Sequence, residues 1–190
     1  IQNNESSTAK IVMNRIFGNV QSGVACLQSS APLVERNTIY QNSYCGVESR
    51  DSSAPSILCN TIEKNTAVGI VARQSSGARI ENNTIRDNPD TGILVQCNLP
   101  KAIKFNKIER SGKNGLLVDG YVHAASESNT FTDNAVGIRV SYADLTQNSN
   151  YINGGTIGLD LYHTSPVITG LNITGTEKGI KFSESNATVS

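Results

Sequence analysis

The chain has 190 residues, of which 16 are basic and 16 acidic, so its formal net charge is zero. This length is enough for one domain with its own core, and the balanced charge excludes nucleic acid or an anionic membrane surface as a partner, since either needs a basic face. No apolar run is long enough for a transmembrane helix, and we expect a single domain over residues 1–190.

One pattern recurs along the chain, every 23 residues at first and every 21 residues later. Each copy begins with an asparagine, at Asn14, Asn37, Asn60, Asn83, Asn106, Asn129 and Asn150. An apolar residue follows two places later, at Ile16, Ile39, Ile62, Ile85, Ile108, Phe131, Ile152 and Ile173. A glycine closes the pattern, at Gly23, Gly46, Gly69, Gly92, Gly115, Gly137, Gly158 and Gly179. About eight copies in register indicate a repeat architecture.

The expected elements within each copy are short strands. Segments such as Asn83–Ile85 and Ile93–Val95 alternate or cluster apolar residues over three to five positions, whereas no segment keeps a helical period. Gly, Asn, Asp and Ser between the segments suit sharp corners. The pattern predicts an all-β fold, a parallel β-solenoid of about eight coils that cover about residues 9–182, with 1–8 and 183–190 as terminal segments or parts of further coils. The asparagine column then forms a hydrogen-bonded structural ladder.

The repeat resembles the right-handed parallel β-helix family, whose motif is N-x-I-x-x-N-x-x-x-G-I. That family includes pectate lyases, alginate epimerases, F-box β-helix proteins and Shc-binding spindle proteins. The corners at Ser29–Pro32 and Ser52–Pro55 both read SSAP and are most similar to the F-box type. This resemblance implies a single-stranded, right-handed helix of coils. It leaves function open, because the same coils carry lyases, epimerases, hydrolases and binding modules.

The four cysteines, Cys26, Cys45, Cys59 and Cys97, stand in four different columns of the repeat. A disulfide needs Cα atoms within about 7 Å, which in a solenoid requires the same or a neighbouring column on adjacent coils. We therefore expect four free thiols, which favours a reducing, cytoplasmic location. No cysteine or histidine cluster has metal-ligand spacing, so neither a metal nor another cofactor is expected.

The residues two and four places after each glycine are expected to point outward. Val71, Leu94 and Leu117 then form an apolar stripe on an outer face, with Arg50 and Arg73 beside it. Three stacked aliphatic side chains need an explanation that single exposed ones do not. Two explanations stay open: a protein-binding surface, or a patch covered by a loop.

Further along the same columns, Arg139, Asp160 and Lys181 form a plus-minus-plus row, with Tyr162 and His163 close beside it. An enzyme that processes uronates needs a cation for the sugar carboxylate, a base for the C5 proton and an acid. These five residues are the catalytic candidates if the chain is an enzyme. The alternative is a set of cross-strand ion pairs without catalytic function.

The remaining aromatic candidates are weaker. Tyr142 lies close to the row, and His123, in the corner segment DGYVHAASES, reads as a solvated corner residue. The segment Gly158–His163, GLDLYH, is only faintly similar to the D-P-H motif of alginate epimerases, because it lacks the proline.

We expect from these observations a non-enzymatic interaction scaffold with a protein partner. The alternative is a carbohydrate-active enzyme (polysaccharide lyase, epimerase or glycoside hydrolase) or a carbohydrate-binding module of polyuronate type, in which case the location is extracellular.

Overall fold

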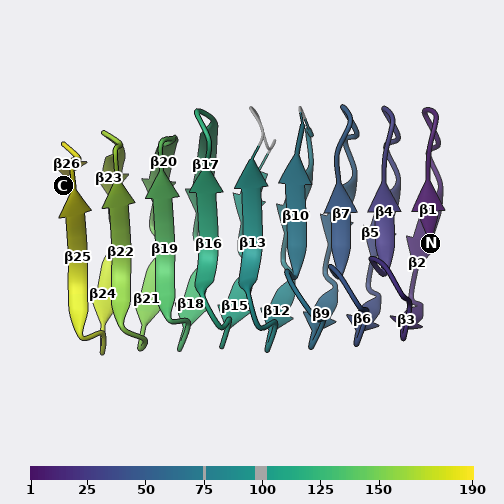
Figure 1. Ribbon diagram of the computed structural model, residues 1–190, viewed down its shortest axis with the longest axis horizontal. Helices are drawn as coiled ribbons and strands as arrows, with labels where there is room; N and C mark the ends of the chain where they lie inside the picture. The colour runs from purple at the N-terminus through teal and green to yellow at the C-terminus, as the bar shows by residue number, and fades with distance from the viewer. Residues whose placement is uncertain (75, 97–101) are drawn as a thin grey trace.

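The computed structural model describes residues 1–74, 76–96 and 102–190, and the regular secondary structure of these residues is entirely β-strand. The strands wind into one parallel solenoid whose coils follow one another along the long axis in chain order (Figure 1). The prediction of an all-β solenoid is confirmed. The described residues include no helix that could cross a membrane.

Each coil contributes one strand to each of three parallel sheets. Sheet A consists of β1 (Gln2–Asn3), β4 (Val24–Cys26), β7 (Val47–Ser49), β10 (Ile70–Arg73), β13 (Thr91–Gln96), β16 (Asn114–Asp119), β19 (Val136–Ser141), β22 (Ile157–Tyr162) and β25 (Lys178–Ser183). Sheet B consists of β2 (Lys10–Val12), β5 (Leu33–Glu35), β8 (Ser56–Leu58), β11 (Arg79–Glu81), β14 (Ala102–Lys104), β17 (His123–Glu127), β20 (Asp144–Asn148), β23 (Val167–Thr169) and β26 (Thr188–Val189). Sheet C consists of β3 (Arg15–Phe17), β6 (Thr38–Tyr40), β9 (Thr61–Glu63), β12 (Thr84–Arg86), β15 (Lys107–Glu109), β18 (Thr130–Thr132), β21 (Tyr151–Asn153) and β24 (Asn172–Thr174).

The strand register places like residues on like. Ile85 in sheet C is paired with Ile62 on one side and Ile108 on the other, and all three are fully buried. A coil has no second layer to pack on, so its apolar side chains are buried only by its own interior and by the equivalent side chains of adjacent coils. The repeated isoleucine is therefore a requirement of burial.

The asparagine column forms the predicted ladder at the corner between sheets B and C. Asn83 Oδ1 accepts hydrogen bonds from the Asn60 backbone N at 2.9 Å and from Asn60 Nδ2 at 3.0 Å, while Asn83 Nδ2 donates to the Ile57 carbonyl at 2.9 Å. Both ends of the amide are satisfied in a position that is 1% exposed. The same bonds link Asn14, Asn37, Asn60, Asn83, Asn106, Asn129 and Asn150.

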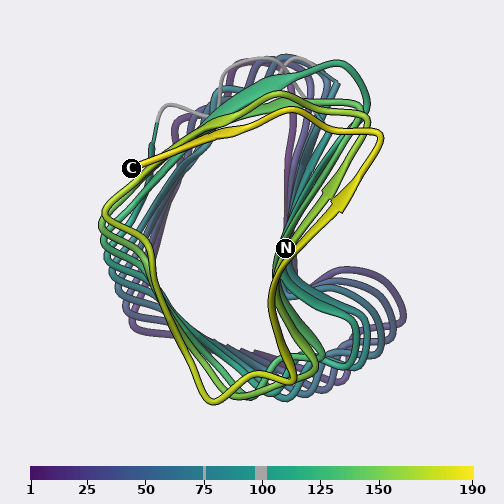
Figure 2. The same cartoon turned by 90° about the vertical axis from the view of Figure 1, so that its left-hand side faces the viewer.

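The corner between sheets C and A, here called the C–A corner, changes along the solenoid. It spans residues 41–46 after β6 but only 175–177 after β24. Figure 2 shows the corner bulging outward beside sheet A in the first coils and drawn in at the last ones. The outer face of sheet A therefore lies between the C–A corner and the corner that leads to sheet B.

Three described cysteines are free: Cys26 and Cys45 are buried and Cys59 is exposed. Burial raises the pKa of both Cys26 and Cys45 to about 12. Cys97 lies outside the described residues.

Candidate functional site

The charged row predicted from the repeat exists on the outer face of sheet A. Arg139 of β19, Asp160 of β22 and Lys181 of β25 are partners in the strand register. Arg139 Nη1 lies 3.4 Å from Asp160 Oδ2, and Lys181 Nζ lies 3.2 Å from Asp160 Oδ1. The Asp160 side chain is 2% exposed, whereas those of Arg139 and Lys181 are 40% and 44% exposed.

The burial of Asp160 determines the sign of the net charge that the row presents to solvent. A buried carboxylate is stable when it is paired, and here two cations pair with one carboxylate. One positive charge is left in excess, on side chains that reach solvent. Asp160 Oδ1 also accepts no hydrogen bond within the described part of the chain, so its ion pair with Lys181 is its main compensation. The row can therefore receive a carboxylate from a ligand.

Two tyrosines and a histidine gather next to the row. Tyr162 shares the outer face of β22 with Asp160, and its hydroxyl accepts a hydrogen bond from the Tyr142 hydroxyl at 3.4 Å. This bond, followed by desolvation, raises the pKa of Tyr142 to about 12, so its hydroxyl stays a proton donor at neutral pH. The His163 ring stacks on Tyr142 at 4.7 Å and meets Tyr162 edge-on at 4.3 Å.

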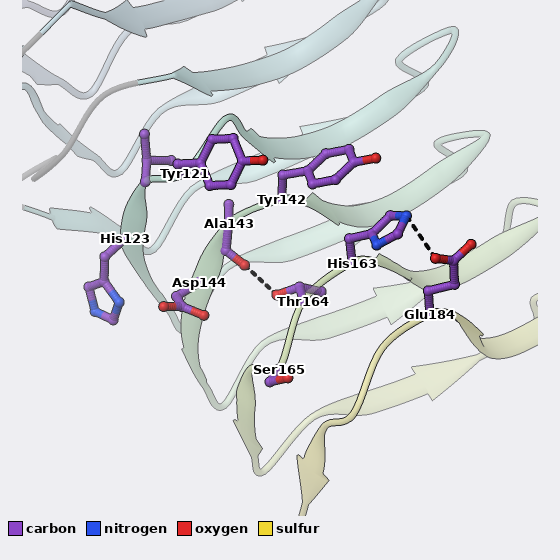
Figure 3. Close-up of a pocket in the computed structure, with 10 residues that line it drawn as sticks. Tyr121, His123, Tyr142, Ala143, Asp144, His163, Thr164, Ser165 and Glu184 are labelled. Carbon is purple, nitrogen blue, oxygen red and sulfur yellow. Dashed lines mark hydrogen bonds and ion pairs between the residues drawn. The ribbon is translucent and has the colours of Figure 1, made fainter.

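His163 is also held from its other side. Its Nε2 lies 3.1 Å from Glu184 Oε2, a contact that becomes an ion pair when the imidazole is protonated (Figure 3). A ring fixed by two aromatic contacts and one carboxylate is suited to proton transfer. The arrangement thus combines two cations that can bind an anionic ligand, Arg139 and Lys181, with a tyrosine hydroxyl and an imidazole, which can each transfer a proton.

A cavity of about 610 Å³ opens at the corner between sheets A and B, beside this cluster. Figure 3 shows Tyr121, Tyr142 and His163 along one side of it, with His123, Asp144 and Ser165 on the other. The C–A corner covers none of these residues, because they belong to the opposite edge of sheet A. The cavity extends the site beyond the charged row.

Sequence reasoning did not single out Tyr121, Asp144, Ser165 or Glu184, which line this cavity. A signal was present, since Tyr121, Tyr142, His163 and Glu184 recur every 21 residues and all have positive φ, between 47° and 57°. These four residues are called the corner column below. His123, interpreted as a solvated corner residue, is indeed exposed, yet it begins β17 and lines the cavity.

At Val71 the apolar stripe follows the second of the two explanations left open, a patch covered by a loop. Val71 is only 2% exposed, because Cys45 and Val68 of the C–A corner pack over it. Leu94 and Leu117 are half-buried, and Leu94 packs against the same cluster. The stripe points outward from sheet A as expected, and the bulging corner covers Val71 and packs against Leu94, so this part of the stripe belongs to a second small core.

Arg50 and Arg73 carry less free charge than the sequence implied. Both contact Glu48, Arg50 through Nε at 3.5 Å and Arg73 through Nη2, and Arg50 also pairs with Asp51. Ser22 donates a further hydrogen bond to Glu48 at 3.3 Å. These arginines hold the nearly buried Glu48 carboxylate in place, and their positive charges are paired with acidic side chains of the protein itself.

Metal chemistry has no visible support in the described ranges. No group of three or more His, Cys, Asp or Glu side chains there is placed to hold an ion. His163 and Glu184 form a pair without a third ligand.

The fold and the site define a parallel β-solenoid with a charged and aromatic face along one of its three sheets. The chain belongs to the family described as the right-handed beta helix region, whose model matches residues 1–144. The finer resemblance to the F-box type stays a prediction. No curated protein matches the sequence.

Two solved structures share the fold. The Azotobacter vinelandii mannuronan C-5 epimerase AlgE4 A-module has a TM-score of 0.68 and 16% identity, over 96% of this chain and 58% of that one. A double mutant of the periplasmic alginate epimerase AlgG has a TM-score of 0.68 and 14% identity, over 95% and 51%. The chain therefore spans between half and three-fifths of the length of either structure.

These neighbours correct the functional expectation. Both are named as epimerases, which contradicts the prediction of a non-enzymatic interaction scaffold; at this identity the likeness shows only the fold, and the carbohydrate-active alternative is a proposal.

Proposed function

We propose that the protein binds a polyuronate chain on the outer face of sheet A and inverts the configuration of its sugar residues at C5. The observation that carries this proposal is the charged row, in which two half-exposed cations surround one buried carboxylate and leave a net positive charge. An anionic polymer supplies the missing negative charge. The polysaccharide named in the titles of the two structural neighbours supports the same class of ligand.

The chemistry requires three roles. Lys181 and Arg139 neutralise the sugar carboxylate, which makes the C5 proton more acidic because the negative charge that develops on its removal is stabilised. Tyr162 removes this proton in its phenolate form, whose negative charge is stabilised by the hydrogen bond from the Tyr142 hydroxyl. His163, in its imidazolium form paired with Glu184, gives a proton to C5. Tyr162 then returns the proton it took to solvent and His163 takes one up, which restores both groups. One proton leaves and one arrives, so the sugar chain keeps its composition.

The test follows hydrogen exchange at C5. Oligomannuronate is incubated with the protein in D₂O, and the H5 signals are followed by proton NMR. We expect deuterium at C5 and a new set of signals from the inverted sugar. A lyase would instead produce an unsaturated end that absorbs in the ultraviolet.

Matched variants separate binding from chemistry. Lys181→Met should reduce exchange by about 100-fold, the scale found when one charge-stabilising group is removed. Lys178→Met, an exposed lysine on the same strand, is the control and should leave exchange intact. Tyr162→Phe should keep oligomannuronate binding but lose exchange. Absence of both binding and exchange in the unmodified protein would refute the proposal.

A further inference from the structure

The cavity at the corner between sheets A and B differs in chemistry from the charged row. Its described lining includes two carboxylates, Asp144 and Glu184, and no lysine or arginine. The hydroxyl of Ser165 and the imidazole of His123 are further polar groups of its lining. A carboxylate ligand would be repelled here, whereas a ligand rich in hydroxyl groups can donate to both acids.

Aromatic rings form one side of this cavity. The Tyr121 and Tyr142 rings lie 5.9 Å apart and are tilted by 41°, and Tyr142 stacks on His163 at 4.7 Å. Tyr121, at the end of this run, is 84% exposed. An exposed, supported ring presents an apolar face beside polar groups, which is how ligand pockets combine contact area with orientation.

The three aromatic residues of this run lie at backbone positions with positive φ. Tyr121, Tyr142 and His163 have φ of 57°, 48° and 47°, a region that bulky L-residues rarely adopt. Earlier coils turn the same corner with the polar residues Gln28 and Asp51, at φ of 51° and 55°. The corner itself therefore needs no aromatic residue, so the rings in the later coils call for another explanation. A ligand that packs on them provides one.

We infer that this corner cavity binds a neutral pyranose, with the carbon-bound hydrogens of the sugar face packed on Tyr121 and its hydroxyl groups donating to Asp144 and Glu184. The hydroxyl of Thr164 is not free to donate to the sugar, because it donates to the Ala143 carbonyl. The site is distinct from the charged row, and the inference does not rest on the proposed epimerase function. The two sites adjoin through His163, which contacts both Tyr142 and Tyr162.

Two probes that differ only at C6 test the inference. Mannotetraose carries a hydroxymethyl group where the mannuronate tetrasaccharide carries a carboxylate. Binding is followed by saturation-transfer NMR, which reports the sugar protons that touch protein, and by titration of each probe. We expect mannotetraose to bind with its strongest saturation on the protons of one ring face.

Variants then assign the binding to the cavity. Tyr121→Ala and Asp144→Asn should each weaken mannotetraose binding by about tenfold, since each removes one of few contacts. Tyr151→Ala removes a tyrosine that is 37% exposed on sheet C and should change nothing. Thermal unfolding of each variant confirms that the fold is kept.

The outcomes separate this inference from the proposed function. Lys181→Met should leave mannotetraose binding unchanged while it weakens binding of the mannuronate tetrasaccharide. If mannotetraose does not bind, or if Tyr121→Ala binds it as tightly as the unmodified protein, the neutral site is refuted even when uronate exchange is observed. If Lys181→Met weakens both probes equally, the cavity is not a separate site and the inference is also overturned.

Discussion

Asp160 shows how one position in a repeat can change from apolar to charged. The equivalent outward position is apolar in the three coils that hold Val71, Leu94 and Leu117, and at Asp160 it carries a charge that is 2% exposed. Burying a charge costs several kcal/mol, and pairing recovers that cost only with good geometry. A fully apolar row would be easier to stabilise, so the retained charges are better explained by a ligand than by stability.

The pKa of Tyr142 depends on the hydrogen bond within the aromatic cluster. Its pKa is raised from 10.0 to about 12, chiefly because its hydroxyl donates to Tyr162. A raised acid pKa means that the interaction is present below pH 10 and is lost as the pH rises through about 12. We predict that Tyr162→Phe, which removes the acceptor oxygen, lowers the pKa of Tyr142 toward 10.

Ultraviolet titration of tyrosinate measures this shift, and the spectrum of Tyr142→Phe assigns the residue. Tyr151→Phe serves as the control, since Tyr151 bonds to Thr174 on another sheet. An unchanged late titration in Tyr162→Phe would show that the hydrogen bond does not set the pKa.

The thiols provide a second test at single residues. Because burial raises the pKa of Cys26 and Cys45 to about 12, their reactive thiolates are scarce until the pH approaches that value. We predict that a Cys97→Ser variant, in which only described cysteines remain, reacts at one thiol when native at pH 8, namely Cys59, and at three after denaturation without reductant. Only one thiol after denaturation would reveal a disulfide, and three fast thiols in the native protein would contradict the burial.

At the scale of the element, the asparagine ladder joins a corner to its neighbours. Asn83 receives two hydrogen bonds from Asn60 and donates from Nδ2 to the Ile57 and Glu81 carbonyls and to Asn106 Oδ1. The ladder therefore fixes the position of sheet B relative to sheet C from Asn14 to Asn150.

We predict that Asn83→Ala lowers the free energy of unfolding by about 1–3 kcal/mol more than Thr84→Ala, because buried partners lose their hydrogen bonds. Thr84 is the matched control, since it is the next residue and its side chain points outward. Denaturant unfolding of the two variants measures the difference. Equal midpoints would mean that the ladder contributes nothing beyond the backbone.

The strands and ladders were predictable because they obey one rule. Burial in a solenoid forces like residues to stack, so Ile62, Ile85 and Ile108 reveal the sheet by their spacing alone. Corners obey no such rule. Whether a corner covers Val71 could not be decided from the sequence, because the length of a corner says nothing about the direction in which it bulges.

The candidate site was predictable only in part, for a related reason. Alternation along β22 and the register with β19 and β25 predict the charged row, but not that Asp160 is buried. The corner column was missed because the corner after β16 is one residue longer than the next one: Asp119 pairs with Ser141, yet His123 pairs with Asp144. One inserted residue places Tyr121 one position further from its glycine than the equivalent residues of later coils. A search that counts a fixed number of residues from each glycine therefore does not find this column.

At the scale of the whole molecule, stability depends on how each coil fits the next one. The glycine column shows this fit, since a Cβ at Gly92 would lie 2.5 Å from Ile108 Cγ2 and 2.7 Å from the Gly115 carbonyl oxygen. Both atoms belong to the next coil and sit in a close-packed interior. Gly179, the last glycine of the same column, has no atom within 4 Å of its Cβ position.

We predict that Gly92→Ala lowers the free energy of unfolding by about 1–3 kcal/mol, because the added methyl group pushes two adjacent coils apart. Gly179→Ala makes the same chemical change in the same column without a coil to collide with, and should stay within about 0.5 kcal/mol of the unmodified protein. Thermal and denaturant unfolding of the two variants measure the contrast. If both substitutions are equally harmful, glycine is needed for the backbone of its own coil, and if both are harmless, the coils are not packed as closely as their register implies.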